Sequence, residues 1–331
     1  MAEVRLNGIS KAFGATLAVD NVTMTTPDGA FVVLLGPTGA GKTTTLRLIA
    51  GLEQPDRGEI EIDGRSVADL TPAQRNVAMV FQQYSLYPHM TVRQNLAFPL
   101  RAPILNTPEP EIARKVAEVA ETLRIAHKLD NKATALSGGE MQRVSIGRAL
   151  VREPSIYLMD EPLSSLDAKL RSDLRIELKR IQASLGATLL YVTHDQIEAM
   201  TMATHVGVLD RGRLVQFGTP REIYENPVSL TVAGRLGLPR INALPADLFA
   251  GAPRAAHTIG LRPEHIQQGE GEPCEVVRIE HLGDQTRLHL RLAGHAIVTL
   301  TDIHTDLEPG ATVAIRPRNA LYFDAQGARV G

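Results

Sequence analysis

Short apolar runs separated by longer mixed segments recur over the first two thirds of the chain. Residues 32–35, 156–159 and 188–193 are short, bounded by turn residues, and composed mainly of apolar or β-branched side chains. Such runs are typical of strands buried on both faces of a parallel sheet. Stretches with helical spacing lie between them, so residues 1–234 are predicted to form an α/β domain.

Two regions depart from this alternation. Residues 84–110 are rich in proline, and residues 111–124 carry apolar side chains at helical spacing, which predicts a helical insert at about 84–155. After residue 234, polar and apolar positions alternate with a period of two, as in half-buried strands, at 274–280, 286–292 and 312–316. We therefore expect residues 235–331 to form a small all-β domain.

The run at 31–35 leads into a glycine-rich segment that matches G-x-x-x-x-G-K-[ST] at a strand-to-helix transition. Its glycines allow successive backbone N–H groups to point at phosphate oxygens, and the following helix directs its positive end at the same charge. We expect Lys42 to lie between the β- and γ-phosphates and Thr43 to bind Mg²⁺. The segment predicts a site for ATP or GTP, formed by Gly36, Pro37, Thr38, Gly39, Ala40, Gly41, Lys42, Thr43 and Thr44.

Two carboxylates follow the apolar run at 156–159. Asp160 is expected to hold Mg²⁺, usually through water, and Glu161 to polarise an attacking water. An Asp-Glu pair in a solvated turn is commonplace. Its position after a buried strand in a nucleotide-binding chain favours the catalytic interpretation.

The segment Leu136–Glu140 precedes a helical stretch. Ser137 has the type and position of an N-cap, and Gly138 and Gly139 leave the helix N-terminus open to an anion. An ordinary capped helix is the alternative.

Taken in order, the phosphate loop, Gln82, Leu136–Glu140, Asp160-Glu161, Ser164–Asp167 and His194 resemble the nucleotide-binding subunit of an ATP-binding cassette (ABC) transporter. This resemblance covers residues 1 to about 235 and implies a P-loop NTPase cassette. Residues 80–90, together with Gly260–His265 in the tail, resemble the ATPase subunits of bacterial carbohydrate importers of the maltose and glycerol-phosphate type. For the tail, the resemblance implies an oligonucleotide-binding-like barrel.

The resemblance also implies roles for single residues. Phe13 would stack on adenine, although a core aromatic is the alternative; Gln82 would contact the metal or the lytic water and sense the permease. Asp167 would cross a dimer interface, and His194 would hold the γ-phosphate and the attacking water. The family's signature ends in Gln where this chain has Glu140, and we expect that charge to affect the strength of the closed dimer.

The loop beside Gln82 contains aromatic and apolar residues and a proline, and exposed aromatic residues often mark contact surfaces. We expect it to dock a permease helix, with simple packing of the helical insert as the alternative. The predicted contact residues are Tyr84, Leu86, Tyr87 and His89.

Composition adds limits. The formal charge of −2 gives no basic excess for nucleic acid, and a single cysteine, Cys274, fits a reducing compartment. No N-terminal signal core and no membrane-spanning apolar run are evident, so we expect a cytoplasmic chain, peripheral to the bacterial inner membrane. Four tail histidines show no metal-ligand spacing: His281, His289, His295 and His304.

The expected protein is thus an ATPase that uses ATP and Mg²⁺ and works as a head-to-tail homodimer. By resemblance its partners are two transmembrane permease subunits and a periplasmic solute-binding protein. A sugar, polyol or glycerol-phosphate-like solute is expected, with polyamine, metal-ion or oxyanion import as the alternative. A soluble non-transport cassette ATPase and a regulatory module without turnover are further alternatives, and the presence of Glu161 and His194 argues against the latter.

Overall fold

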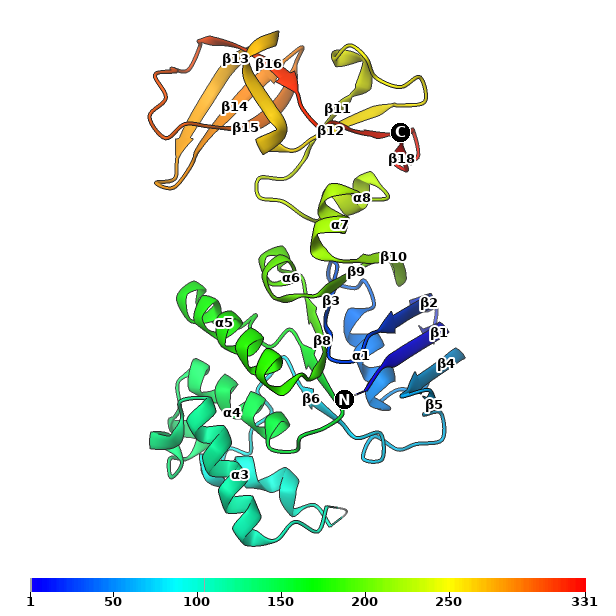
Figure 1. Cartoon of the computed structure of the whole chain (residues 1–331), viewed down its shortest axis with the longest axis vertical. Coiled ribbons are helices and arrows are strands. Elements are labelled where there is room, and N and C mark those ends of the chain that lie inside the picture. Colours follow the sequence, from blue (N-terminus) through cyan, green and yellow to red (C-terminus); the bar gives the residue numbers. More distant parts are fainter. Residues whose placement is uncertain (1, 104) are drawn as a thin grey trace. The chain divides into compact units, whose positions relative to one another are not determined.

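The computed structural model describes residues 2–103 and 105–331, which form two compact units, Met1–Pro220 and Arg221–Gly331 (Figure 1). The domain boundary expected at 234 stays a prediction, and residues 221–234 belong to the second of these compact units. Within that unit Arg262, which is 2% exposed, donates hydrogen bonds to the carbonyl groups of Tyr224, Ala233 and Leu236.

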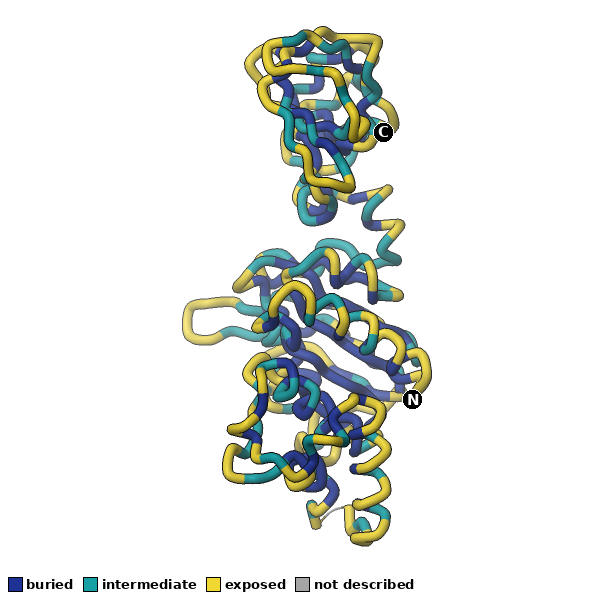
Figure 2. Tube along the Cα trace, turned by 90° about the vertical axis from the view of Figure 1, so that its left-hand side faces the viewer, coloured by how far each residue is buried: buried dark blue, intermediate teal, exposed yellow. Residues whose placement is uncertain are grey.

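A six-stranded sheet in the order β10-β9-β3-β8-β7-β6 forms the centre of the first unit. All neighbouring strands are parallel except β10, which is antiparallel to β9. The strand bounds are β3 (Phe31–Leu35), β6 (Val77–Val80), β7 (Ile156–Asp160), β8 (Thr188–Thr193), β9 (His205–Asp210) and β10 (Arg213–Gly218). Every residue of β3, β7 and β8 is buried, which confirms the three strands predicted from apolar runs (Figure 2).

Helices pack against this sheet and also form the insert between β6 and β7. The helices of the first unit are α1 (Lys42–Ala50), α2 (Val92–Ala97), α3 (Glu109–Thr122), α4 (Gly138–Leu150), α5 (Ala168–Leu185) and α6 (Gln196–Met202). Short 3₁₀ turns cover Phe98–Arg101, Ala126–Lys128 and Ala133–Ala135. The helical insert predicted at about 84–155 is therefore present, apart from residue 104, which lies outside the described residues.

The N-terminal residues form an antiparallel sheet in the order β2-β1-β4-β5. Its strands are β1 (Val4–Phe13), β2 (Thr16–Thr26), β4 (Arg57–Ile62) and β5 (Arg65–Ser66). The sequence pattern predicted strand–helix alternation throughout residues 1–234 and gave no sign of this hairpin. Burial alternates along β1 and β2, as expected when only one face of a sheet is covered.

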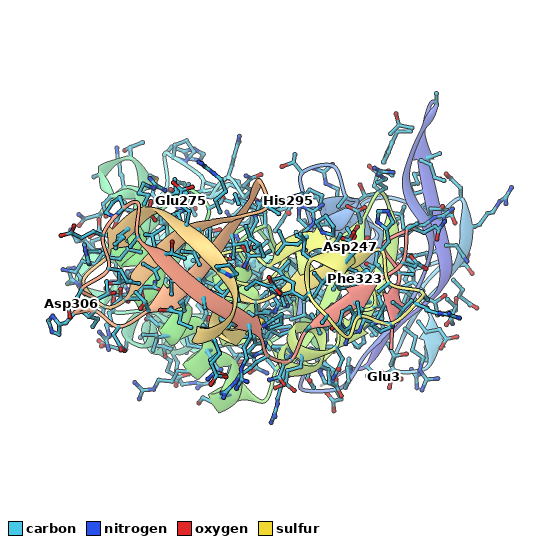
Figure 3. All side chains as sticks on the ribbon, turned by 90° about the horizontal axis from the view of Figure 1, so that it is seen from above. Glu3, Asp247, Glu275, His295, Asp306 and Phe323 are labelled. Carbon is cyan, nitrogen blue, oxygen red and sulfur yellow. The ribbon has the colours of Figure 1, made fainter. Side chains whose placement is uncertain are left out.

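The second unit begins within α7 (Pro220–Glu225), which is followed by α8 (Leu230–Ala233). It continues as strands with two 3₁₀ turns, Ala246–Leu248 and Pro263–His265. One sheet, β11-β12-β17-β18, contains Asn242–Pro245, Thr258–Leu261, Leu321–Phe323 and Arg329–Val330. The other, β15-β14-β13-β16, contains His295–Thr301, Thr286–Leu292, Ile266–His281 and Thr312–Pro317. Glu275 and His295 mark the second of these sheets in Figure 3, and Phe323 marks the first. The predicted all-β character of the tail is confirmed.

Candidate nucleotide-binding site

The glycine-rich segment forms a tight loop between β3 and α1. Gly39 and Gly41 have φ angles of 80° and 94°, in the left-handed region that favours glycine. A Cβ on Gly36 would lie 2.4 Å from the carbonyl oxygen of Leu209, and one on Gly41 would lie 2.3 Å from that of Ala18. The close backbone approach therefore requires glycine at both positions.

Lys42, the first residue of α1, points back into this loop. Its Nζ donates to the carbonyl oxygens of Gly36 and Pro37, each at 3.0 Å, and lies 3.7 Å from Glu161 Oε1. The side chain is only 5% exposed. A buried ammonium group enclosed by a glycine loop at a helix N-terminus is suited to an anionic ligand.

The predicted metal-binding pair is also assembled. Thr43 Oγ1 donates to Asp160 Oδ1 at 2.8 Å, joining the first turn of α1 to the last residue of β7. Burial raises the pKa of Asp160, and the nearby Glu161 charge adds to that rise, whereas the Thr43 hydrogen bond opposes it. A hydroxyl and a carboxylate oxygen are ligands of the kind that Mg²⁺ prefers, so these two residues fit a magnesium ion.

Glu161 and His194 meet at the carboxyl ends of neighbouring strands. Glu161 has a φ of 43° and its N–H donates to Val192 O at 3.0 Å, which turns the chain sharply after β7. His194 follows β8, and its Nδ1 lies 3.1 Å from Glu161 Oε2. The carboxylate of Glu161 thus lies between the Lys42 ammonium and the His194 ring.

Phe13 and Gln82 lie at more exposed positions. Phe13 is 47% exposed, with Lys11 Nζ 5.6 Å from its ring centroid, so it is not the core aromatic of the alternative interpretation. Gln82 follows β6 and is exposed.

The segment Leu136–Glu140 forms the N-terminus of α4, as predicted. Ser137 is the N-cap, and its side chain accepts from Glu140 N while the Glu140 side chain accepts from Ser137 N, which is a capping box. Gly139 packs so tightly that a Cβ there would lie 2.2 Å from Leu170 Cδ2 on α5. A Cβ on Gly138 would lie 3.2 Å from the Tyr84 hydroxyl.

Sequence reasoning missed a set of contacts that tie the loops together. Asp167 caps α5, accepting from Leu170 N at 3.0 Å. One turn later, Arg171 donates to the carbonyl oxygens of Leu163 and Leu166 at 3.3 and 2.7 Å, and lies 4.0 Å from Asp195 beside His194. The N-cap was readable from an Asp before a helical stretch, but the Arg171 contacts depend on the folded loops.

The loop predicted to contact a permease is partly packed within the chain. The Tyr87 ring centroid lies 4.4 Å from that of Phe98, and Arg148 Cζ lies 4.8 Å from the Tyr87 ring. The hydroxyl of Tyr84 lies 3.0 Å from Ser165 Oγ. Leu86 is half-buried and His89 is exposed.

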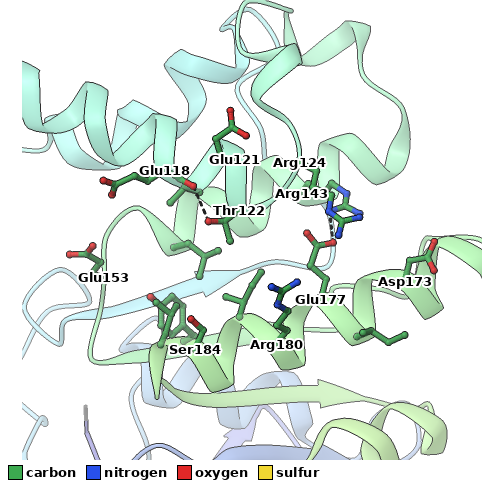
Figure 4. Close-up of a pocket in the computed structure, with 16 residues that line it drawn as sticks. Glu118, Glu121, Thr122, Arg124, Arg143, Glu153, Asp173, Glu177, Arg180 and Ser184 are labelled. Atoms are coloured by element: carbon green, nitrogen blue, oxygen red, sulfur yellow. Dashed lines mark hydrogen bonds and ion pairs between the residues drawn. The ribbon is translucent and has the colours of Figure 1, made fainter.

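A groove of about 850 Å³ lies apart from these residues, between α3, α4 and α5 (Figure 4). Arg143 and Glu177 form an ion pair in it. Its lining does not include the phosphate loop or the carboxylates after β7. Among the described residues, no group of three or more His, Cys, Asp or Glu side chains could hold a metal ion. The described helices include none that combines the length and the apolar character needed to cross a bilayer.

The sequence of this chain matches two protein-family models and is similar to import ATP-binding proteins. The ABC transporter family model matches residues 19–164, and the TOBE domain model matches residues 259–323. The sn-glycerol-3-phosphate import ATP-binding protein UgpC of Ruegeria sp. (strain TM1040) is 45% identical over 351 residues, which covers 100% of this chain and 99% of the relative. The trehalose/maltose import ATP-binding protein MalK of Thermococcus litoralis is 45% identical over 338 residues, covering 90% of each chain.

Solved structures agree with these matches. MJ1267, an ATP-binding cassette of an ABC transporter in its ADP conformation, aligns with a TM-score of 0.62 at 26% identity and covers 70% of this chain and 98% of its own. MJ0796, a bacterial ABC transporter cassette solved as a dimer, aligns with a TM-score of 0.60 at 29% identity and covers 66% of this chain and 99% of its own.

Proposed function

This chain belongs to the ABC transporter family as an ATP-binding subunit and ATPase, and we propose that it drives the import of a glycerol-phosphate-like or sugar-like solute. The observation that carries the ATPase role is the meeting of Lys42, Asp160, Glu161 and His194 at one edge of a parallel sheet. Ligands bind at this edge in open α/β sheets.

The residues of this site have different roles in the transfer of the γ-phosphoryl group to water. Lys42 and the residues of the glycine-rich loop, including Thr38, Ala40 and Thr44, bind the phosphates. Glu161 orients and polarises the attacking water, and His194 holds the Glu161 carboxylate through Nδ1. Phe13, exposed beside Lys11, offers its face to the adenine ring.

Magnesium is the cofactor of this proposal. Thr43 and Asp160 would hold the ion, and the exposed Gln82 would complete the site. When bound, Mg²⁺ neutralises phosphate charge and helps to orient the leaving group. The buried Asp160 carboxylate, whose pKa is raised, gains a compensating charge in that arrangement.

We further propose that two copies act head to tail. Ser137, Gly138 and Gly139 of each copy face the phosphates held by the partner copy, and Asp167 lies at the shared interface. The dimeric cassette among the similar structures supports this arrangement, as does the N-terminus of α4, where Ser137 is followed by two glycines.

Membrane partners complete the proposal. The chain would work at the cytoplasmic face of the bacterial inner membrane with two permease subunits and a periplasmic solute-binding protein. The loop holding Tyr84, Leu86, Tyr87 and His89 would contact the permease. Its link to Ser165, two residues before Asp167, supports a path from the dimer interface to that loop.

The solute is tested by transport. The native complex is purified through this chain, reconstituted with its binding protein into liposomes, and given ATP on the side of this chain. Uptake of glycerol 3-phosphate or of maltose and trehalose, lost in a complex carrying Glu161→Gln, supports the proposal. Uptake of a polyamine, metal ion or oxyanion in their place contradicts the solute class, and a complex without permeases contradicts the importer role.

A further inference from the structure

Glu140 is held at the start of α4 by a network within its own chain. Its Oε2 accepts hydrogen bonds from the backbone N–H of Ser137 at 2.8 Å and from the Ser137 hydroxyl at 2.9 Å. Its Oε1 lies 3.0 Å from Lys128 Nζ. The backbone N–H of Glu140 in turn donates to Ser137 Oγ at 3.4 Å. Both hydrogen-bond donors of Ser137 are therefore engaged.

This network opposes the binding of a second anion. A carboxylate can only accept hydrogen bonds, so the Ser137 hydroxyl proton must point at Glu140. A phosphate also needs that proton, and it would bring a second negative charge to the same helix N-terminus. The pKa of Glu140 is lowered, mainly by the Ser137 N–H and further by Lys128, so the carboxylate is charged at neutral pH.

Lys128 approaches from a different element, the 3₁₀ turn Ala126–Lys128. It contacts the carboxylate oxygen that Ser137 does not use, so the ion pair can persist when the Ser137 hydrogen bonds break. The two side chains are 28% and 25% exposed, which leaves the pair accessible to a partner surface. The ammonium also offsets the charge that would repel a phosphate.

We propose that Glu140 and Lys128 are positioning residues for Ser137. Glu140 occupies the hydrogen-bond donors of Ser137 in the single chain. Lys128 holds the Glu140 carboxylate when a phosphate replaces it as the acceptor from Ser137. This inference rests on the proposed function, in which Ser137 meets a nucleotide held by the partner copy. Its consequence is that pairing of two chains must first open the capping box. The Glu140–Lys128 pair therefore shifts the Kd of the ATP-dependent dimer.

The test separates the effect of the Glu140 charge from the effect of its capping box. The full chain carrying Glu161→Gln is the parent, and sedimentation measures the Kd of its ATP-dependent dimer. Glu140→Gln keeps a residue that can form a capping box but removes the charge, and should lower this Kd about tenfold, the scale of one charge-assisted hydrogen bond. Lys128→Met should raise the Kd to a similar extent, because the carboxylate is then unopposed.

The double variant isolates the pair. With Glu140→Gln already present, Lys128→Met should change the Kd by less than about twofold, since no carboxylate remains to be held. Lys132→Met, at an exposed lysine of the same segment, is the matched control for loss of charge and should leave the Kd unchanged. An unchanged Kd in Glu140→Gln, or an equal effect of Lys128→Met in both backgrounds, overturns the inference.

A readout on the single chain separates this inference from the proposed function. Hydrogen exchange of peptides covering residues 136–141 is measured without nucleotide. Exchange should accelerate in Glu140→Ala, which cannot close the capping box, and stay slow in Glu140→Gln. Equal exchange in Glu140→Ala and the parent overturns the inference, even where ATP still pairs the chains. If ATP does not promote dimerisation of the parent, the proposed dimer is contradicted. Hydrogen exchange then tests only whether Glu140 caps α4 in the single chain.

Discussion

At the residue scale, Glu161 occupies a position that matches a general base. Its carboxylate lies between a buried ammonium and an imidazole, 3.7 Å from Lys42 Nζ and 3.1 Å from His194 Nδ1. Glu161→Gln retains the shape and a hydrogen-bond partner for His194 but polarises water far less. We expect turnover to fall by about 10²–10⁴-fold with ATP binding retained. Steady-state ATPase and nucleotide-binding assays measure both, with Glu59→Gln on the exposed surface of β4 as the control.

Asp160 gives a prediction in which stability and activity change in opposite directions. Burial raises its pKa, so the folded chain binds that proton more tightly than the unfolded chain does. The stabilising effect of protonation is present at low pH and is lost as pH rises from the unfolded pKa through the folded one. At neutral pH, Asp160→Asn should therefore raise the Tm of the nucleotide-free chain by about 2 °C while abolishing Mg²⁺-dependent ATPase. A lower Tm with normal ATPase would contradict both assignments.

At the scale of single elements, Asp167 has one role in the structure and a second in the proposal, and the two can be separated. It caps α5 through Leu170 N, and the proposal also places it at the dimer interface. Asp167→Ala should destabilise the chain by about 1 kcal/mol, whereas Asp167→Ser should restore the cap and most of the stability. Thermal unfolding reports the cap, and ATPase activity reports the interface. If Asp167→Ser regains full ATPase as well as stability, the residue serves the helix alone.

The loop after β6 combines packing and exposure, so its variants must separate the two. Tyr87 contacts both Phe98 and Arg148, and its removal would damage the insert itself. Leu86→Ser is the sharper change, because Leu86 is only half-buried. It should leave ATP binding by the isolated chain near normal but lower solute-stimulated ATPase and transport. Tyr87→Phe, which keeps the ring contacts, is the matched control. Undiminished transport in Leu86→Ser would leave packing as the role of this loop.

The limits of prediction from sequence follow from the same elements. The strands β3, β7 and β8 were predicted because burial on both faces leaves a continuous apolar run in the sequence. The residues after β7 and β8 were placed because strand ends in a parallel sheet share one edge. The N-terminal hairpin was missed, since register shifts between β1 and β2 interrupt the alternation of polar and apolar positions that revealed the tail strands. The Arg171–Asp195 and Lys128–Glu140 ion pairs join separate elements, and no local pattern encodes them.

At the scale of the whole molecule, the proposed head-to-tail pair implies that one chain alone holds only half of each nucleotide site. Lys42 belongs to the phosphate loop and Ser137 to the N-terminus of α4, and the head-to-tail arrangement assigns them to different halves of each composite site. A chain carrying Lys42→Ala loses phosphate binding, and one carrying Ser137→Arg blocks the surface that its partner copy needs. Each variant alone should then be inactive, because every site in its homodimer carries the same lesion.

Mixing the two variants distinguishes composite sites from sites within one chain. A heterodimer contains one site with an intact phosphate loop from one chain and an intact Ser137 from the other. ATP should therefore promote heterodimers in the mixture under conditions in which neither variant alone forms homodimers. Fluorescence energy transfer between differently labelled variants measures this pairing, and ATPase recovery should be partial because the second site stays doubly damaged. Ser137→Arg also removes the α4 cap, so its unfolding curve is recorded first, with Ser137→Ala as the control that loses the cap without adding bulk. If each chain holds a complete site, mixing restores nothing, and the partner copy has no part in binding the nucleotide.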